Sequence, residues 1–323
     1  MEKMMDRREF LKLTARAGSG IVATGGIGLW LASRSEKPTP KVEISESMDF
    51  RIPASPDLPE LASAKGDSPA QLTQTVINAL GGINRFISKG DIVVIKPNIG
   101  WDRIPQQAAN TNPDVVKKTV ELCYSAGAKK VIVTDVSCND PRRCFARSGI
   151  ATAVEQVGAE VQLPEDRKFR RINMGGVVLK NWPIYTQFLE ADKVINIPIL
   201  KHHNLTRLTI GMKNWYGIIG GIRSQLHQDI HNSIADLAQF MKPTLVILDA
   251  FRVIFTNGPQ GGSPKDVKNL NIVAAGTDQV AIDAYGAYIF GINPEELPFI
   301  KIANQRGIGK MNINEINIKN LVV

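Results

Sequence analysis

The sequence has few cysteines, and this shortage excludes two kinds of metal or redox centre. The three cysteines among 323 residues are Cys123, Cys138 and Cys144, an odd number that cannot close a paired disulfide framework. They also lack the repeated C-x-x-C spacing of structural zinc sites and four-cysteine iron–sulfur clusters, so this chain alone builds neither centre. No residue period indicates a solenoid or a coiled coil. With 43% hydrophobic and 22% charged residues, the composition is that of a globular protein of one or two domains.

The first 34 residues have the pattern of an export signal. Arg7 and Arg8 precede a short apolar stretch, Ile21 to Ala32, that glycines interrupt. This order predicts a twin-arginine signal, and therefore export across the cytoplasmic membrane by the twin-arginine machinery. The alternative, a basic amphipathic helix, is disfavoured by the helix-weakening glycines. The apolar stretch is short for a membrane span, and no A-x-A site precedes Ser33, so a cleaved signal and an uncleaved membrane tether both stay open.

We expect residues 35–59 to form a linker and residues 60–323 a single α/β domain. The segment 1–34 carries six Lys/Arg and three Asp/Glu, so it supplies +3 of the net charge of +8 and leaves +5 for the rest. That modest excess favours a small anionic ligand. It is far from the clustered basic stripe of a nucleic-acid-binding protein, so we expect no nucleic acid as a partner.

Short runs rich in Val and Ile alternate with segments of helical period along the rest of the chain. The alternation predicts an α/β fold, with a mainly parallel, mixed sheet and helices on both faces. Residues 161–180 resemble short antiparallel strands, which either join the sheet or form a small second lobe. The expected strands are Ile92–Lys96, Lys130–Asp135, Lys193–Ile197, Thr244–Asp249 and Asn271–Ala275. The expected helices are 69–80, 113–126, 150–157, 230–241 and 278–290.

Polar side chains stand where four of these strands end. Ligands of open α/β sheets bind outside the carboxyl ends of parallel strands, so we expect these side chains to share one cleft although they are far apart in sequence. The alternative is that each strand end is polar because it meets solvent. The candidate roles are anion neutralisation by Lys96 and Lys201, acid–base chemistry by His203, and ligand binding or orientation by Asn98, Asp135 and Asp249.

A second group of candidates lies between residues 202 and 231. Lys213 and Asn214 stand in an otherwise apolar segment, where a charged residue needs a partner or a cleft; the alternative is a lysine that reaches the surface. All four histidines fall in this stretch as well. His227 and His231 are four residues apart, which places both rings on one helical face and predicts a divalent metal or a metal-containing cofactor. The alternative is that His227 belongs to a capping loop and His231 faces solvent.

Short motifs follow one another along the chain in a recognisable order. They are KPN at 96–98, D-x-S at 135–137, K-x-H-x(9)-KN-x-x-G from 201, H-x-x-x-H-x-x-x-x-D from 227, LDA at 248–250, the glycine pair at 261–262 and GTD-x-x-A-x-D from 276. With these motifs the chain resembles the domain-of-unknown-function 362 family over roughly residues 60–318. That family appears in iron–sulfur proteins, often fused to a ferredoxin-like domain, which implies a cluster-bearing redox partner here. The resemblance names no reaction.

A second resemblance concerns the order His203, Lys213, a glycine turn, and then His227 or His231. It is similar to the His, Lys, His series in the catalytic domain of nickel-pincer lactate racemases. The resemblance implies that Lys213 holds a metal-containing cofactor covalently, that His203 moves the substrate proton, and that His227 or His231 ligates the metal. Ile210-Gly211-Met212 stands where those racemases have a glycine pair before the lysine.

Two functional hypotheses follow from the sequence. The first is an exported enzyme with redox or isomerase chemistry on a small anionic substrate, dependent on a metal or a metal-containing cofactor. The second is a non-catalytic extracytoplasmic protein that binds a ligand or assists electron transfer. A His203→Gln variant distinguishes them, because ligand affinity would survive in a binder whereas turnover would collapse in an enzyme.

Overall fold

The computed structural model describes residues 43–44 and 47–323 of the chain. The predicted export signal, residues 1–34, lies outside the described residues. Within them, no helix combines the length and the apolar character that crossing a bilayer requires. The strand β2 (Met48–Asp49) falls in the segment expected to be a linker, and it pairs with β12 (Met241–Lys242).

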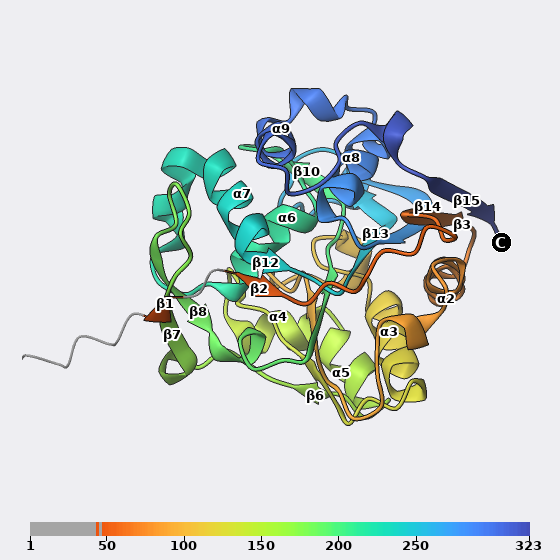
Figure 1. Cartoon of the computed structure of the whole chain (residues 1–323), viewed down its shortest axis with the longest axis horizontal. Coiled ribbons are helices and arrows are strands. Elements are labelled where there is room, and N and C mark those ends of the chain that lie inside the picture. Colours follow the sequence, from red (N-terminus) through yellow and green to blue (C-terminus); the bar gives the residue numbers. More distant parts are fainter. Residues whose placement is uncertain (1–42, 45–46) are drawn as a thin grey trace, which may run out of the picture. The chain divides into compact units, whose positions relative to one another are not determined.

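An eight-stranded sheet forms the centre of the fold (Figure 1). In spatial order its strands are β15 (Ile318–Val322), β3 (Leu61–Lys65), β14 (Val267–Gly276), β13 (Leu245–Ile254), β9 (Lys193–Ile197), β4 (Ile92–Pro97), β5 (Lys130–Val133) and β6 (Glu160–Val161). Within this sheet β14 is antiparallel to both of its neighbours, and every other adjacent pair is parallel. The mainly parallel, mixed sheet expected from the sequence is therefore confirmed.

Helices cover both faces of this sheet, as the sequence predicts. One layer contains α2 (Pro69–Ala79), α3 (Pro113–Ser125), α4 (Pro141–Arg147) and α5 (Ile150–Glu155). The other contains α6 (Gly211–Asn214), α7 (Ile230–Phe240), α8 (Gln279–Phe290) and α9 (Pro298–Gln305). In Figure 1 the first group occupies the lower part of the view and the second group the upper part. Each layer has its own hydrophobic core against the sheet.

Alternate residues of the central strands supply the two cores. On β4, Val93 and Ile95 pack with α2 and α3, whereas Val94 points to the opposite layer. On β13, Val246 and Leu248 pack with α7 and α8. Because successive side chains of a strand point to opposite faces, a strand buried on both sides needs an unbroken apolar run, and that is the pattern these runs show.

A small three-stranded sheet stands apart from the main one. β7 (Phe169–Asn173) and β8 (Asn181–Tyr185) form an antiparallel hairpin, and β1 (Glu43–Ile44) pairs with β7 in parallel. The antiparallel strands expected in 161–180 correspond to this hairpin, whose second strand begins one residue later.

One buried carboxylate joins this hairpin to the helices behind it. Asp236 on α7 accepts hydrogen bonds from the backbone N–H groups of Val177, Val178 and Leu179, in the loop between β7 and β8. It also forms a 2.6 Å ion pair with Arg306, the residue after α9. Three segments distant in sequence are thereby held at a single side chain.

The main helices begin where the sequence predicts. The Ser68 side chain accepts a hydrogen bond from the Gln71 N–H, and Asn112 does the same for Asp114, each just before a proline that opens the helix. The Asp278 carboxylate caps α8 in the same way.

The segment between Cys138 and Cys144 contains the start of α4 and is not a loop throughout. Asp140 caps this helix and Pro141 occupies its first position, the same signal that opens α2 and α3. Both cysteines are free thiols, with Cys138 exposed and Cys144 buried.

Candidate functional site

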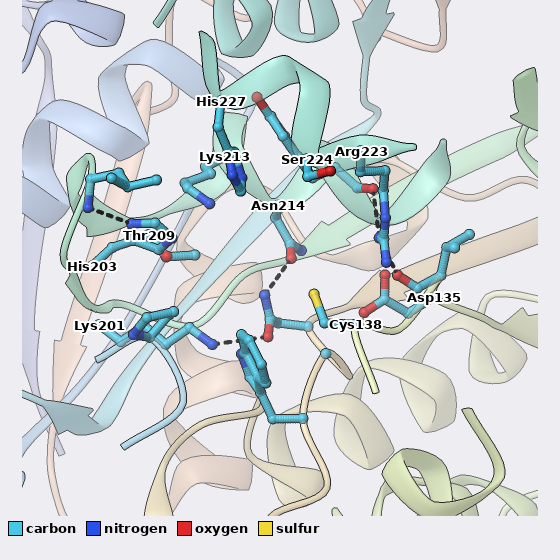
Figure 2. Close-up of a pocket in the computed structure, with 18 of the residues that line it drawn as sticks. Asp135, Cys138, Lys201, His203, Thr209, Lys213, Asn214, Arg223, Ser224 and His227 are labelled. Carbon is cyan, nitrogen blue, oxygen red and sulfur yellow. Dashed lines mark hydrogen bonds between the residues drawn. The ribbon is translucent and has the colours of Figure 1, made fainter. Parts of the chain in front are cut away.

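A cavity of about 650 Å³ collects most of the side chains expected at the strand ends (Figure 2). The predicted residues that line it are Lys96, Asn98, Asp135, Lys201, His203, Lys213, Asn214 and His227. They come from β4, the segments after β4 and β5, the hairpin of β10 (Lys201–His203) and β11 (Arg207–Thr209), α6, and the turns before α7. Asp249 and His231 are not among the lining residues.

A buried ion pair forms the wall of the cavity at the ends of β4 and β5. Lys96 and Asp135 lie 2.7 Å apart, and each side chain is almost completely buried. Burial lowers the pKa of Lys96, and the charge of Asp135 opposes that shift. The second Asp135 oxygen accepts the Ile99 N–H at 2.6 Å, so both charges of the pair are held by the protein itself.

A chain of side-chain amides crosses the cavity floor. The Lys201 amine donates to Asn98 Oδ1 at 3.2 Å, and Asn98 Nδ2 donates to Asn214 Oδ1 at 2.9 Å (Figure 2). Asn214 Nδ2 donates to Asn196 Oδ1 at 2.8 Å, and Asn196 donates to the Gly211 carbonyl at 2.9 Å. Every bond in this chain therefore points in the same direction, from Lys201 toward the start of α6.

Lys201 is fully buried, and its amine donates a second, 2.5 Å hydrogen bond to the Ala109 carbonyl. Burial lowers the pKa of Lys201 to about 7, and the charges of Lys213 and Lys96 add to the shift. No carboxylate pairs with Lys201 among residues 43–44 and 47–323.

Lys213 differs from the other two lysines because nothing in the described part of the chain accepts a hydrogen bond from its amine or pairs with its charge. The amine lies 5.1 Å from the centre of the Tyr216 ring. Burial lowers the pKa of Lys213 to about 8, and the nearby guanidinium of Arg223 contributes. An amine so placed is available to a ligand in the cavity.

The tautomer of His203 is fixed by the backbone. Its Nδ1 accepts hydrogen bonds from the N–H groups of Leu205 at 3.1 Å and Thr206 at 3.4 Å, so the neutral ring carries its proton on Nε2. Burial, together with Lys213 and Lys201, lowers the pKa of His203 to about 2. This histidine is thus a neutral hydrogen-bond donor.

The two histidines predicted to ligate a metal lie in different surroundings. His227 lines the cavity and stacks on Tyr216, with 6.4 Å between ring centres. His231 stacks on Phe299 at 6.3 Å. No group of three His, Cys, Asp or Glu side chains in the described residues is arranged to hold a metal ion. The structure brings only His227 of this pair to the cavity, and the metal stays a prediction.

Asp249 is buried beside the cavity but serves the backbone. It accepts the Asn112 N–H at 2.7 Å, just before α3, and the Phe251 N–H at 3.1 Å. Burial raises the pKa of Asp249 to about 6. Of the six candidates expected in one cleft at the strand ends, the other five line the cavity, whereas Asp249 positions the start of α3.

Several lining residues were not predicted from the sequence. Arg223 donates to the carbonyls of Val136, Ser137 and Tyr216, and so fixes the segment that follows β5. Other unpredicted lining residues include Cys138, Thr209, Tyr216 and Ser224. Buried Asn196, a polar residue between Ile195 and Ile197, could have been found, because an amide within an apolar strand needs hydrogen-bond partners.

Trp101 and Trp215 have different roles. Trp101 lines the cavity, whereas Trp215 is fully buried and donates from Nε1 to Gln279 Oε1 at 2.8 Å.

Two further positions determine the shape of the site. The Asp283 carboxylate accepts the N–H groups of Gly211 at 2.7 Å and Met212 at 3.1 Å, which anchors the start of α6 two residues before Lys213. Gly217 packs so closely on the ion pair that a Cβ there would lie 1.8 Å from an Asp135 oxygen.

Comparison of the sequence with known proteins finds a family and a similar protein. The family described as "Domain of unknown function (DUF362)" matches residues 93–288. A thylakoid-associated protein of Synechocystis sp. is 26% identical over 243 residues, which cover 73% of this chain and 74% of that protein.

Two solved structures show a more distant similarity. The lactate racemase apoprotein from Thermoanaerobacterium thermosaccharolyticum has 15% identity and a TM-score of 0.44, and the match covers 74% of this chain and 57% of that one. A Thermotoga maritima protein has 10% identity and a TM-score of 0.39, with 75% and 60% covered. This chain therefore spans less than two thirds of either solved protein.

Proposed function

This chain belongs to the domain-of-unknown-function 362 family, and from that premise we propose that it is an enzyme that binds a small anionic substrate in the cavity and moves a proton on it, as isomerases do. The observation that carries the proposal is the Lys213 amine, which has no hydrogen-bond or ion-pair partner in the described part of the chain and lies in a cavity whose lining holds four cationic side chains and one carboxylate. That carboxylate, Asp135, is already paired with Lys96.

The excess positive charge favours an anion as the ligand. Removing an ammonium group from water is unfavourable unless an opposite charge or hydrogen bonds replace the water. Lys201 has two hydrogen-bond acceptors but no anionic partner in the described structure, and Lys213 has neither. A carboxylate or phosphate bound at Lys201 would provide the missing charge, and it would raise the pKa of the amine that it contacts.

Proton transfer is the chemistry that the remaining groups support. His203 presents a fixed Nε2–H donor, which can stabilise negative charge developing on a substrate oxygen. The pKa values of Lys201 and Lys213 are lowered to about 7 and about 8. These values lie close to neutral pH, where an amine can accept and return a proton. His227 has no hydrogen-bond partner among the described residues, and burial lowers its pKa, so its neutral ring is a further base. Export, a redox partner and a metal-containing cofactor stay predictions beside this proposal.

The test is hydrogen exchange into bound acids. We would incubate the protein in heavy water with 2-hydroxy and 2-oxo carboxylates of increasing size, and follow exchange of the carbon-bound hydrogens by NMR, with calorimetry to measure binding. We expect exchange with at least one acid, its loss in Lys213→Met, and a loss of about 100-fold in His203→Gln with little change in affinity.

His231→Gln is the matched control, since this histidine does not line the cavity. Loss of exchange in this variant would instead support the predicted metal pair. Binding without exchange would favour the non-catalytic binding protein. The absence of both would contradict the proposal.

A further inference from the structure

We propose that Lys213 is a nucleophile that forms an imine with a carbonyl-bearing anion, a 2-oxo acid or an aldehyde acid. The inference rests on the proposed function and narrows it, because it names the substrate class and gives Lys213 a covalent role. It is argued from the surroundings of the three cavity lysines, from the groups that can hold the anion, and from those that can move the protons.

The three amines differ in whether their nitrogen is free to react. The Lys96 amine is paired with Asp135 and also donates to the Pro97 carbonyl at 2.9 Å and to Asn214 at 3.0 Å. The Lys201 amine donates to Asn98 and to the Ala109 carbonyl. The Lys213 amine makes no hydrogen bond or ion pair within the described residues, and the face of the Tyr216 ring lies 5.1 Å from it. Of these three lysines, Lys213 is therefore the one whose amine, once deprotonated, can attack a ligand without first breaking a hydrogen bond.

The surroundings of Lys213 also favour the reactive, neutral amine. Burial lowers its pKa to about 8; the Cys138 thiol opposes this shift and the Arg223 guanidinium adds to it. Roughly a tenth of such amines are neutral at pH 7, against fewer than about one in a thousand for an ordinary lysine. Desolvation and a neighbouring cation are the means by which lysine is activated as a nucleophile.

Lys201 is placed to hold the anionic end of the ligand. Its amine lies at the cavity floor, where it donates to Asn98. The charge of Lys213 lowers the pKa of Lys201, and the charges of both lysines lower the pKa of His203, so the three side chains are close enough to interact. Figure 2 shows Lys213, His203 and His227 gathered at one side of the cavity, with Lys201 below them. A carboxylate held at Lys201 would place an adjacent carbonyl among these three side chains.

The reaction needs no oxidant or reductant. The neutral Lys213 amine attacks the carbonyl carbon, a C–N bond forms, and a proton moves from nitrogen to the former carbonyl oxygen. Protonation of the resulting hydroxyl and loss of water leave a C=N bond whose nitrogen keeps its remaining proton, so one proton is taken up and one water released. His227, whose ring lines the cavity and has no hydrogen-bond partner in the described part of the chain, can carry these protons.

An iminium at this position would also serve the proposed proton transfer. The positively charged nitrogen withdraws electrons from the neighbouring C–H bond, and the carbanion formed on proton loss is stabilised by the C=N bond. His203 Nε2–H remains available to the carboxylate or to an oxygen on the next carbon.

Reductive trapping tests the inference on the unmodified chain. The full-length protein is treated with pyruvate and sodium cyanoborohydride at pH 7, and the modified lysines are located by peptide mass spectrometry. We expect one dominant adduct on Lys213, formed roughly 100-fold faster than on an exposed lysine such as Lys319, because the lowered pKa of Lys213 makes its neutral amine more abundant. Acetate, which binds as an anion but has no ketone, should compete with pyruvate and form no adduct.

Lys213→Arg is the matched variant, because it keeps the positive charge and removes the reactive amine. It should lose the adduct while it still binds acetate in calorimetry. If pyruvate and acetate both bind the unmodified protein but no adduct forms on Lys213, the imine is overturned and the anion-binding function stands. If neither anion binds and no adduct forms, both fall. Trapping on Lys201 instead of Lys213 would also overturn the assignment.

Discussion

The three lysines of the cavity differ in the groups that contact their amines. Lys96 has a carboxylate, Lys201 has two neutral oxygens, and Lys213 has an aromatic face. In the proposed function, the same residue type therefore has three roles at one site: a structural ion pair, an anchor for an anion, and a reactive amine.

The anion affinity should depend on pH through Lys201 and Lys213. Their pKa values are about 7 and about 8, and an anion binds their charged forms. Affinity should be greatest below pH 7 and should fall as pH rises through both values, by up to about tenfold per pH unit for each charge lost. Calorimetry with acetate, from one unit below the lower pKa to one unit above the higher, measures this. An affinity constant over that range would contradict the assignment.

Removing one partner of the buried ion pair should destabilise the protein. Asp135→Asn leaves the Lys96 ammonium buried without its counter-charge, which costs about 3–5 kcal/mol of unfolding free energy. The double variant Lys96→Met/Asp135→Asn should recover part of that loss, since no unpaired charge remains. Urea unfolding of the single and double variants provides the comparison. Equal stability of Asp135→Asn and the native protein would show that the pair is not buried as described.

A methyl group at Gly217 should disrupt the same pair. The new Cβ would lie 1.8 Å from the Asp135 carboxylate and 2.6 Å from the Lys96 amine, so one of them must move. Gly217→Ala should lose acetate binding and about 1–3 kcal/mol of stability. Gly100→Ala is the control in the same cavity, because its nearest neighbours would be 3.7 Å away. Equal effects of the two substitutions would contradict this packing argument.

At the scale of elements, the short helix α6 depends on a residue from another helix. Asp283 on α8 accepts the first two N–H groups of α6, and burial holds the pKa of this carboxyl well above its usual value. A helix of four residues has too few internal hydrogen bonds to fix its own position. The direction in which Lys213 points is therefore set by α8.

Loss of the Asp283 carboxylate, which accepts the first two N–H groups of α6, should move Lys213 without unfolding the sheet. Asp283→Ala leaves two buried N–H groups unsatisfied, and we expect a loss of about 2–4 kcal/mol in urea unfolding together with weaker acetate binding. Asp114→Ala, at an exposed first-turn position of α3, should cost less than about 1 kcal/mol. The argument fails if Asp283→Ala binds acetate as the native protein does.

The elements themselves were predictable where local chemistry determines them. The strand Lys193–Ile197 has the bounds expected from its apolar run, and α2 and α3 begin at their Ser-Pro and Asn-Pro signals. β3 and β15 were missed, because Leu61–Lys65 is rich in small residues and Ile318–Val322 alternates too weakly to stand out. Their pairing is a contact between the two ends of the described domain, which no local pattern contains.

At the scale of the whole molecule, the candidate site was predictable only in part. The rule that ligands bind at strand ends brought Lys96, Asp135 and Lys201 together correctly. It could not separate Asp249, whose carboxylate faces the backbone of α3, from the residues that face the cavity. Helical spacing likewise placed His227 with His231, but the first lies in the turns before α7 and the second within it.

The Asp236 carboxylate, which joins three segments distant in sequence, gives a prediction at the scale of the whole molecule. Asp236→Ala would release Arg306 and three backbone N–H groups of the β7–β8 loop, which should cost about 3–5 kcal/mol. Glu296→Ala breaks an exposed ion pair with Arg207 and should cost no more than about 1 kcal/mol. Urea unfolding compares the two, and equal losses would contradict the role of the Asp236 carboxylate.

The chain of amides beneath the cavity has a consequence for how the site responds to a change of charge. Its hydrogen bonds run in one direction from Lys201 through Asn98, Asn214 and Asn196 to Gly211. The Lys201 amine remains the donor to Asn98 whether or not it carries its extra proton. No side-chain amide has to rotate when Lys201 gains or loses that proton, so the dipoles of the cavity floor keep one orientation. The reorganisation energy of this proton transfer is therefore low.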